Sequence, residues 1–168
     1  LYLKSQNNRK IYGWRPDLPD HRDLMGDFSH MFSSLPNKID LRPNCPKVYN
    51  QGKLGSCTAN AIAAAFEYDQ MKEKANGKDI DIFVPSRLFI YYCERNMEDS
   101  TDHDSGAMIR DGIKVVHRLG CCDEKIWSYD IRKFTDKPPD SVYEDALNHK
   151  CVKYMRLHQC KRTLKACL

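Results

Sequence analysis

The segment "QGKLGSCTANAIAAAFEYDQ" (51–70) constrains the fold of this chain more than any other stretch. A polar turn with glycines at 52 and 55 leads into Cys57, and the residues that follow are alanines and large apolar side chains. Apolar residues recur near helical spacing from 56 to about 74, which predicts a long helix with Cys57 in its first turn. Alanine makes such a helix narrow, so we expect it to lie deep among other elements.

The rest of the pattern predicts mostly helical structure with one strand near the end. Pro85 suits the first turn of a second helix, and Gly120 suits the end of a third. The polar, acidic stretch at 96–106 is expected to be a solvated loop. The expected elements are helices at 86–95, 107–119 and 141–148, an alternating strand at 151–157, and a last helix that starts at 163.

Composition excludes some classes of function. The chain has 168 residues, 41% of them hydrophobic, which suits one domain or one domain with an extension. No apolar run approaches the roughly 18 residues that a membrane span needs. The net charge of +4 is mixed in sign, and no basic patch carries stacking aromatics, so neither a membrane nor nucleic acid is an expected partner. A secreted, lysosome-like or viral location fits better than a nuclear one.

Cys57 lies where a thiol can act as a nucleophile. A helix N-terminus stabilises negative charge through its unpaired N–H groups and aligned peptide dipoles, which favours the reactive thiolate. The glycines at 52 and 55 let the backbone pass close to an approaching group. Gln51 offers an amide donor that, with the backbone N–H of Cys57, suits the oxyanion of acyl transfer. The alternative is a small buried cysteine in a tight turn.

Several motifs, in order along the chain, resemble those of papain-like cysteine peptidases. "QGKLGSCTANA" is similar to the segment around the family's nucleophile, and "LPNKIDLRPN" to the start of the mature enzyme. "FVPSRLFIYYCER", "DSGAMIRDGIKVVHRLG" and "WSYD" resemble later segments of the family. The resemblance covers about 35–168. It implies an α+β fold, with a helical left domain followed by the beginning of a β-rich right domain.

The resemblance also implies roles for matched residues. Cys57 would be the nucleophile, Gln51 the oxyanion donor, and Ser105 with Gly106 the segment that binds the backbone of a peptide or protein substrate. Ser105 replaces a glycine of the family pattern, which puts in doubt the hydrogen bonding between this segment and the substrate backbone.

Other positions depart from the family pattern. Thr58 stands where the family usually has an aromatic residue. Leu54 replaces a cysteine that in many members forms a disulfide near the substrate segment. Cys93 matches another disulfide cysteine of the family, with Cys121 or Cys122 as its expected partner.

The family's catalytic histidine and asparagine are not found in matching contexts. They are expected roughly 130–150 residues after the cysteine, beyond position 168. The domain assignment is therefore an extended arm at 1–34 (a possible short propeptide), a left domain at 35–150, and the start of a right domain at 151–168. We expect the missing residues on a second chain or on the remainder of the polypeptide, and we expect this chain alone to be inactive. No cofactor is expected.

Two other functions stay open. His149, Cys151, His158 and Cys160 form two His-x-Cys pairs, whose ligand types suit zinc although their spacing is unusual. The second alternative is a peptidase-like binding module without activity, in which Cys57 is a relic. Disulfides and several buried free thiols are both compatible with the eight cysteines.

Overall fold

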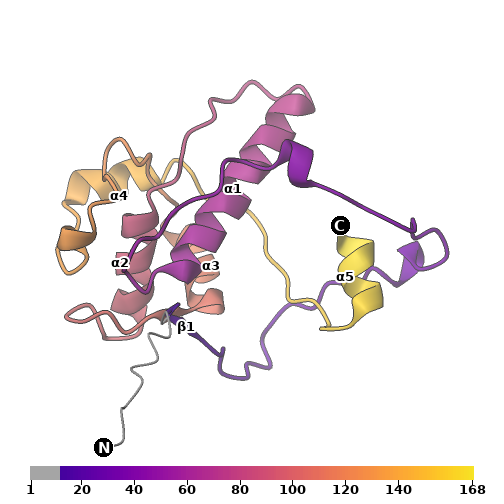
Figure 1. The fold of residues 1–168 in the computed structure, drawn as a ribbon, viewed down its shortest axis with the longest axis horizontal. Helices are drawn as coiled ribbons and strands as arrows, with labels where there is room; N and C mark the ends of the chain where they lie inside the picture. The colour runs from indigo at the N-terminus through magenta and orange to yellow at the C-terminus, as the bar shows by residue number, and fades with distance from the viewer. Residues whose placement is uncertain (1–11) are drawn as a thin grey trace, which may run out of the picture.

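The computed structural model describes residues 12–168, and its centre is a packed group of three helices. They are α1 (Cys57–Ala75), α2 (Arg87–Met97) and α3 (Ile109–Arg118), and each contacts the other two. Helix α1 crosses the pair formed by α2 and α3 (Figure 1). The remaining elements are β1 (Trp14–Arg15), η1 (Ser29–Met31), η2 (Arg42–Asn44), β2 (Ala107–Met108), η3 (Ile131–Lys133), α4 (Asp140–Ala146) and α5 (Lys161–Cys167).

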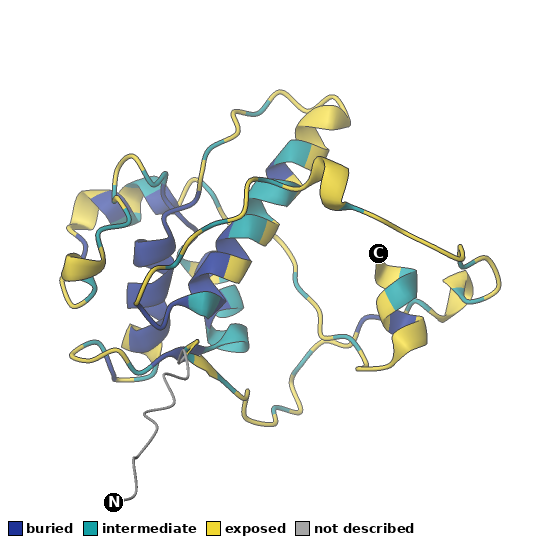
Figure 2. Cartoon of the chain, in the orientation of Figure 1, coloured by how far each residue is buried: buried dark blue, intermediate teal, exposed yellow. Residues whose placement is uncertain are grey.

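The hydrophobic core surrounds α2. Every residue of that helix from Arg87 to Arg95 is buried, and α1 is buried mainly in its first half (Figure 2). Ala59 and Ala63 of α1 are fully buried, so the alanine-rich sequence does place this helix deep in the fold. Its small side chains let the neighbouring helices approach closely.

The helix predictions are confirmed with small shifts at their ends. Ser86 caps α2, because its hydroxyl oxygen accepts a hydrogen bond from the backbone N–H of Phe89 at 3.2 Å. Helix α3 begins at Ile109 rather than 107, since Ala107 and Met108 form the short strand β2 instead. The last helix, α5, begins at Lys161, before the predicted 163.

The strand predicted at 151–157 is wrong. This segment is irregular, and its one ladder contact is an isolated bridge between Arg156 and Met25. A strand requires a neighbour along its length to pair its backbone groups. Here Arg156 pairs with Leu24 and Gly26 of the arm, whereas Cys151 donates to the carbonyl of Val116 in α3, so the described residues form no continuous ladder along this segment. The segment leads away from the helical body to α5, which lies beside η1 (Figure 1).

All eight cysteines lie among the described residues, and each is a free thiol in the structure. The expected bond from Cys93 to Cys121 or Cys122 is therefore not present. These three thiols are buried, and burial is the main reason that the pKa of Cys93 rises to about 12. They act as small apolar side chains of the core.

The N-terminal arm follows the surface of α3. The carboxylate of Asp23 pairs with Arg110 at 2.6 Å and with Arg156 at 2.9 Å, so one aspartate joins the arm to α3 and to the C-terminal segment. Residues 1–11 of the predicted arm lie outside the described residues. The division into an arm and two domains stays a prediction. No helix within 12–168 has the length and apolar character to span a bilayer.

Gly112 tests how tightly α3 packs on its neighbours. A Cβ at this position would lie 2.0 Å from Oε1 of Glu94 and 2.3 Å from Cδ1 of Ile62. We predict that Gly112→Ala lowers the free energy of unfolding by about 1–3 kcal/mol through overpacking. Urea denaturation measures the change, with Arg118→Ala at an exposed position of α3 as the control. Equal stabilities of the two variants would contradict this packing.

Candidate active site around Cys57

Cys57 is the first residue of α1 and is half-buried. Side chains of α1 and of the loop that carries Tyr129 hold the residue before it, Ser56, in place. The amide of Asn60 donates to the backbone carbonyl of Ser56 at 2.8 Å, and the Ser56 hydroxyl hydrogen-bonds the hydroxyl of Tyr129. The predicted position of Cys57 at a helix N-terminus is therefore correct.

The environment of Cys57 keeps its thiol protonated. Burial raises the pKa of Cys57, and the charge that Glu94 carries above about pH 8 acts in the same direction. Hydrogen bonds from backbone groups of α1 and of Trp14 in the arm lower it, but burial outweighs them. The helix N-terminus alone does not produce the thiolate that the sequence argument expects.

Gln51 lies in the turn that leads to Cys57. Its side-chain amide donates to the carbonyl of Leu54 at 2.9 Å, and its backbone carbonyl accepts from the Tyr129 hydroxyl at 3.0 Å. One N–H of the amide is thus used within the turn, and an amide nitrogen carries a second. The oxyanion role of Gln51 stays a prediction.

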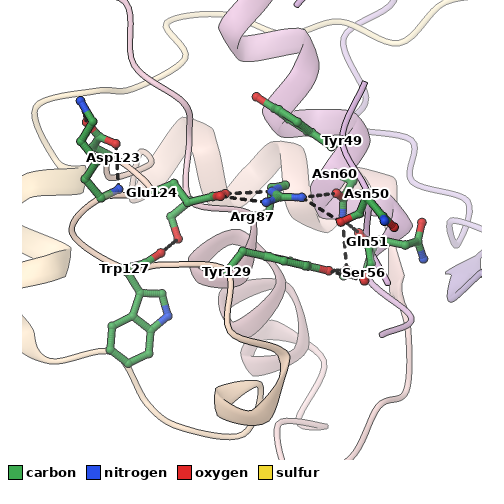
Figure 3. Close-up of polar contacts among 12 residues, drawn as sticks. Tyr49, Asn50, Gln51, Ser56, Asn60, Arg87, Asp123, Glu124, Trp127 and Tyr129 are labelled. Carbon is green, nitrogen blue, oxygen red and sulfur yellow. Dashed lines mark hydrogen bonds and ion pairs between the residues drawn. The ribbon is translucent and has the colours of Figure 1, made fainter. Parts of the chain in front are cut away.

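A buried arginine, Arg87, holds this turn, and no sequence motif marks it as part of the site (Figure 3). Its Nε and Nη2 each donate to the carboxylate of Glu124 at 2.8 Å. Its Nη1 donates to the carbonyl of Asn50 and to Oδ1 of Asn60, both at 3.2 Å. The guanidinium therefore connects the turn before Cys57, the first part of α1 and the loop after 122.

Two aromatic rings complete the surroundings of Arg87. Its guanidinium lies 4.0 Å from the ring centre of Tyr129 and 4.8 Å from that of Tyr49. The pattern of 86–95 predicts a helix, but an arginine next to Ser86 gives no signal of a buried role. Its hydrogen-bond partners lie 27 to 37 residues away in sequence, and only the fold reveals them.

The segment predicted to bind substrate, Ser105–Gly106, lies at the edge of β2. Gly106 is buried with a φ of +70°, a conformation that favours glycine, and its N–H donates to the Tyr91 hydroxyl at 3.1 Å. The Ser105 hydroxyl bonds the hydroxyl of Ser100 at 2.9 Å and the carbonyl of Gly106 at 2.8 Å. The serine side chain is thus used within its own loop.

The arm lies directly against this segment. Strand β1 pairs in parallel with β2, and the N–H of Ala107 donates to the carbonyl of Gly13 at 2.8 Å. A Cβ on Gly13 would lie 1.7 Å from the carbonyl oxygen of Gly55, and one on Gly106 would lie 1.9 Å from that of Gly13. The backbone at Gly13 therefore fills the space between the turn before Cys57 and the Gly106 segment.

No hydrogen bond or ion pair in the described part of the chain joins a histidine to Cys57. His117 bonds the carbonyl of Cys151 at 2.7 Å, and His103 pairs with Asp102 at 2.6 Å. His149 packs against Phe83, with ring centres 4.5 Å apart. Each of these three histidines thus contacts a residue other than Cys57.

The zinc alternative is contradicted. Within 12–168 no group of three or more potential ligand side chains is placed to hold a metal ion. Cys160, one of the proposed ligands, caps α5 by accepting a hydrogen bond from the N–H of Thr163 at 3.4 Å. Cys151 instead lies against the carbonyl of Lys153 at 3.3 Å.

Comparison with known proteins agrees with this geometry. An uncharacterised peptidase C1-like protein of Acanthamoeba polyphaga mimivirus is 42% identical over an alignment 169 positions long, and the match covers 90% of this chain and 53% of that protein. The crystal structure of xylellain, a cysteine protease from Xylella fastidiosa, matches with a TM-score of 0.85 and 45% identity, over 94% of this chain and 62% of that one. No protein-family model matches the sequence.

The chain belongs to the papain-like cysteine peptidase family. The α+β fold class expected from the motifs is confirmed by the solved structure. The chain spans about half the length of its mimivirus relative, at 53%.

Glu94 lies next to the first turn of α1 and is fully buried. Its Oε2 accepts a hydrogen bond from the hydroxyl of Thr58 at 2.8 Å, and its Oε1 has no partner among the described residues. Burial raises the pKa of Glu94 to about 8. Thr58, which departs from the family pattern, therefore pairs with a carboxyl group that is neutral at pH 7.

We predict that Glu94 makes stability depend on pH between about 4.5 and about 8. In that window the folded protein keeps a proton that the unfolded chain has released, so the free energy of unfolding falls as pH rises, by up to about 1.4 kcal/mol per unit. Glu94→Gln removes this contribution. Urea denaturation over a pH series compares it with wild type and with Glu144→Gln, an exposed control. A slope unchanged by Glu94→Gln would contradict the prediction.

Proposed function

We propose that this chain supplies the nucleophile and the oxyanion site of a cysteine endopeptidase. The sulfur of Cys57, deprotonated by a histidine, attacks the substrate carbonyl carbon, and the Gln51 amide with the Cys57 N–H binds the oxyanion. The carbon–nitrogen bond then breaks, and the histidine returns its proton to the leaving amine. Water, deprotonated by the same histidine, hydrolyses the thioester and restores the thiol.

The observation that best supports this proposal is the seating of a peptide strand beside Cys57. Backbone groups of 13–15 pair with β2, next to Gly106 and to the turn that carries Gly55. A site that accepts one extended backbone at this edge suits the binding of another. The histidine and the asparagine that orients it would come from the remainder of the polypeptide or from a second chain.

We predict that the full protein hydrolyses fluorogenic peptides and that Cys57→Ser abolishes this activity. Gln51→Ala should lower kcat on the order of a hundredfold or more, because an oxyanion donor acts mainly in the transition state. The control is Cys45→Ser, which changes an exposed thiol. A folded full protein that binds peptides without Cys57-dependent turnover would favour the non-catalytic binding module.

We further propose that the arm keeps this site closed as a propeptide. Beyond its strand pairing, the arm is held by an ion pair between Arg15 and Glu98 and by a hydrogen bond from the Arg110 N–H to Asp17 at 3.0 Å. Glu98 also accepts from the N–H of Met108 at 2.9 Å, so one carboxylate holds both β2 and the arm. A substrate backbone at this edge would have to displace these contacts.

Gly13→Val provides a point test of this closure. Gly13 has a φ of +80°, and its missing Cβ leaves room for the carbonyl of Gly55. A β-branched residue in that conformation costs at least about 1–2 kcal/mol, so we expect peptide hydrolysis to rise on the order of tenfold.

Leu18→Ala is the matched control for that test, since it changes an exposed arm side chain. It should leave the hydrolysis rate unchanged. Equal rates for Gly13→Val and wild type, with both proteins folded, would show that the arm does not limit access.

A further inference from the structure

Two loops form the sides of the site, and one carboxylate joins them. The N–H of Gly55 donates to Asp104, at 3.1 Å to Oδ1 and at 2.9 Å to Oδ2. Gly55 lies two residues before Cys57, and Asp104 lies two residues before Gly106. The contact therefore spans from the nucleophile's turn to the predicted substrate segment, over 49 residues of sequence.

The side chain of Tyr91 anchors this contact in the core. Tyr91 is fully buried in α2, and its hydroxyl donates to Oδ1 of Asp104. The hydroxyl oxygen of Tyr91 also accepts a hydrogen bond from the N–H of Gly106 at 3.1 Å. Burial raises the pKa of Tyr91, and its bond to Asp104 adds to this, so the hydroxyl remains a donor at physiological pH.

The loop that carries Asp104 is itself held from below. The guanidinium of Arg95 donates to the carbonyls of Thr101 at 3.0 Å and His103 at 3.1 Å, and it stacks over the ring of Tyr91 at 4.3 Å. Arg95 is a fully buried residue of α2, so these hydrogen bonds attach the loop to that helix. Asp104 is exposed at the surface, yet its carboxylate is directed into the protein by these contacts.

Gly55 is required for the close approach. A Cβ at this position would lie 2.9 Å from Oδ1 of Asp104. A side chain at this position would therefore force the Asp104 carboxylate to shift from its place beside the Gly55 amide.

We infer that Asp104 and Tyr91 are positioning residues that hold the Gly55 turn and the Gly106 segment in fixed register. The inference rests on the proposed function, in which Cys57 attacks a peptide bound along Gly106. Neither residue touches the reacting atoms. Their role is to keep the nucleophile at a set distance from the bound backbone, where small displacements cost large factors in rate.

The first test is hydrogen exchange of the Gly55 and Gly106 amides, measured by NMR. Asp104→Ala should speed exchange at Gly55, and Tyr91→Phe should speed it at both amides, each on the order of tenfold from the loss of a hydrogen bond. Tyr91→Phe keeps the buried ring, which separates loss of the hydroxyl from loss of packing. His103→Ala changes an exposed neighbour and is the control. Unchanged exchange at Gly55 in both variants would overturn the inference.

The second test compares two reagents on Cys57, followed by mass spectrometry. Iodoacetamide needs only the thiol, whereas a peptidyl epoxysuccinate also needs the bound backbone in register. Each variant is made in two parent proteins, one with the native arm and one with Gly13→Val. It is then compared with the parent in which it was made. We expect both variants to lose on the order of tenfold in the peptidyl rate with little change in the iodoacetamide rate.

The outcomes separate the two proposals. A parallel fall of both rates would indicate general loosening and would overturn the positioning role. A parent protein whose Cys57 reacts with iodoacetamide but never with the peptidyl reagent would count against the proposed function. The exchange measurements would still decide whether Asp104 and Tyr91 hold the two loops together.

Discussion

The buried guanidinium of Arg87 is the interaction on which the site geometry most depends. A charge removed from water must be paired and fully hydrogen-bonded, and here the partners come from separate parts of the chain. Burial lowers the pKa of Arg87, but the hydrogen bonds and charge of Glu124 outweigh it, so the pKa is raised and the ion pair is maintained. The turn at 49–51 and the start of α1 therefore have little freedom to move relative to each other, and this restraint includes Cys57 as the first residue of α1.

Two opposing effects of the surrounding structure determine the protonation of Cys57. Backbone N–H groups at the head of α1 favour the thiolate, whereas burial favours the thiol. A buried anion beneath the sulfur would add to that penalty, but Glu94 is neutral below about pH 8. The chain thus avoids placing a second negative charge under its nucleophile. In the proposed mechanism, an imidazolium close to the sulfur would supply the positive charge that favours the thiolate.

Local patterns predicted much of the fold and the position of the nucleophile. Helical periodicity identified α1, α2 and α3, and the glycine-rich turn located Cys57, because both signals lie within a few residues of sequence. The strand at 151–157 failed because alternation says nothing about whether a partner strand is present.

The contacts that hold the site could not be predicted in the same way. Arg87 pairs with Glu124 at a separation of 37 residues, and Thr58 pairs with Glu94 at 36. Asp104 looked like one acidic residue among several in a solvated loop. Its exposure agrees with that expectation, but its bond to Gly55 depends on how two loops meet in the fold.

The meeting of Gly13, Gly55 and Gly106 shows how the arm differs from a substrate. At Gly13 the backbone passes so close to Gly55 that no Cβ fits, and its φ of +80° is one that other residues rarely adopt. A general peptide substrate carries a side chain at nearly every position, so it cannot follow this backbone path. The arm and a substrate would thus compete for the edge of β2 while taking different paths past the nucleophile's turn. Such an arm can block the site without presenting a bond in the geometry for cleavage.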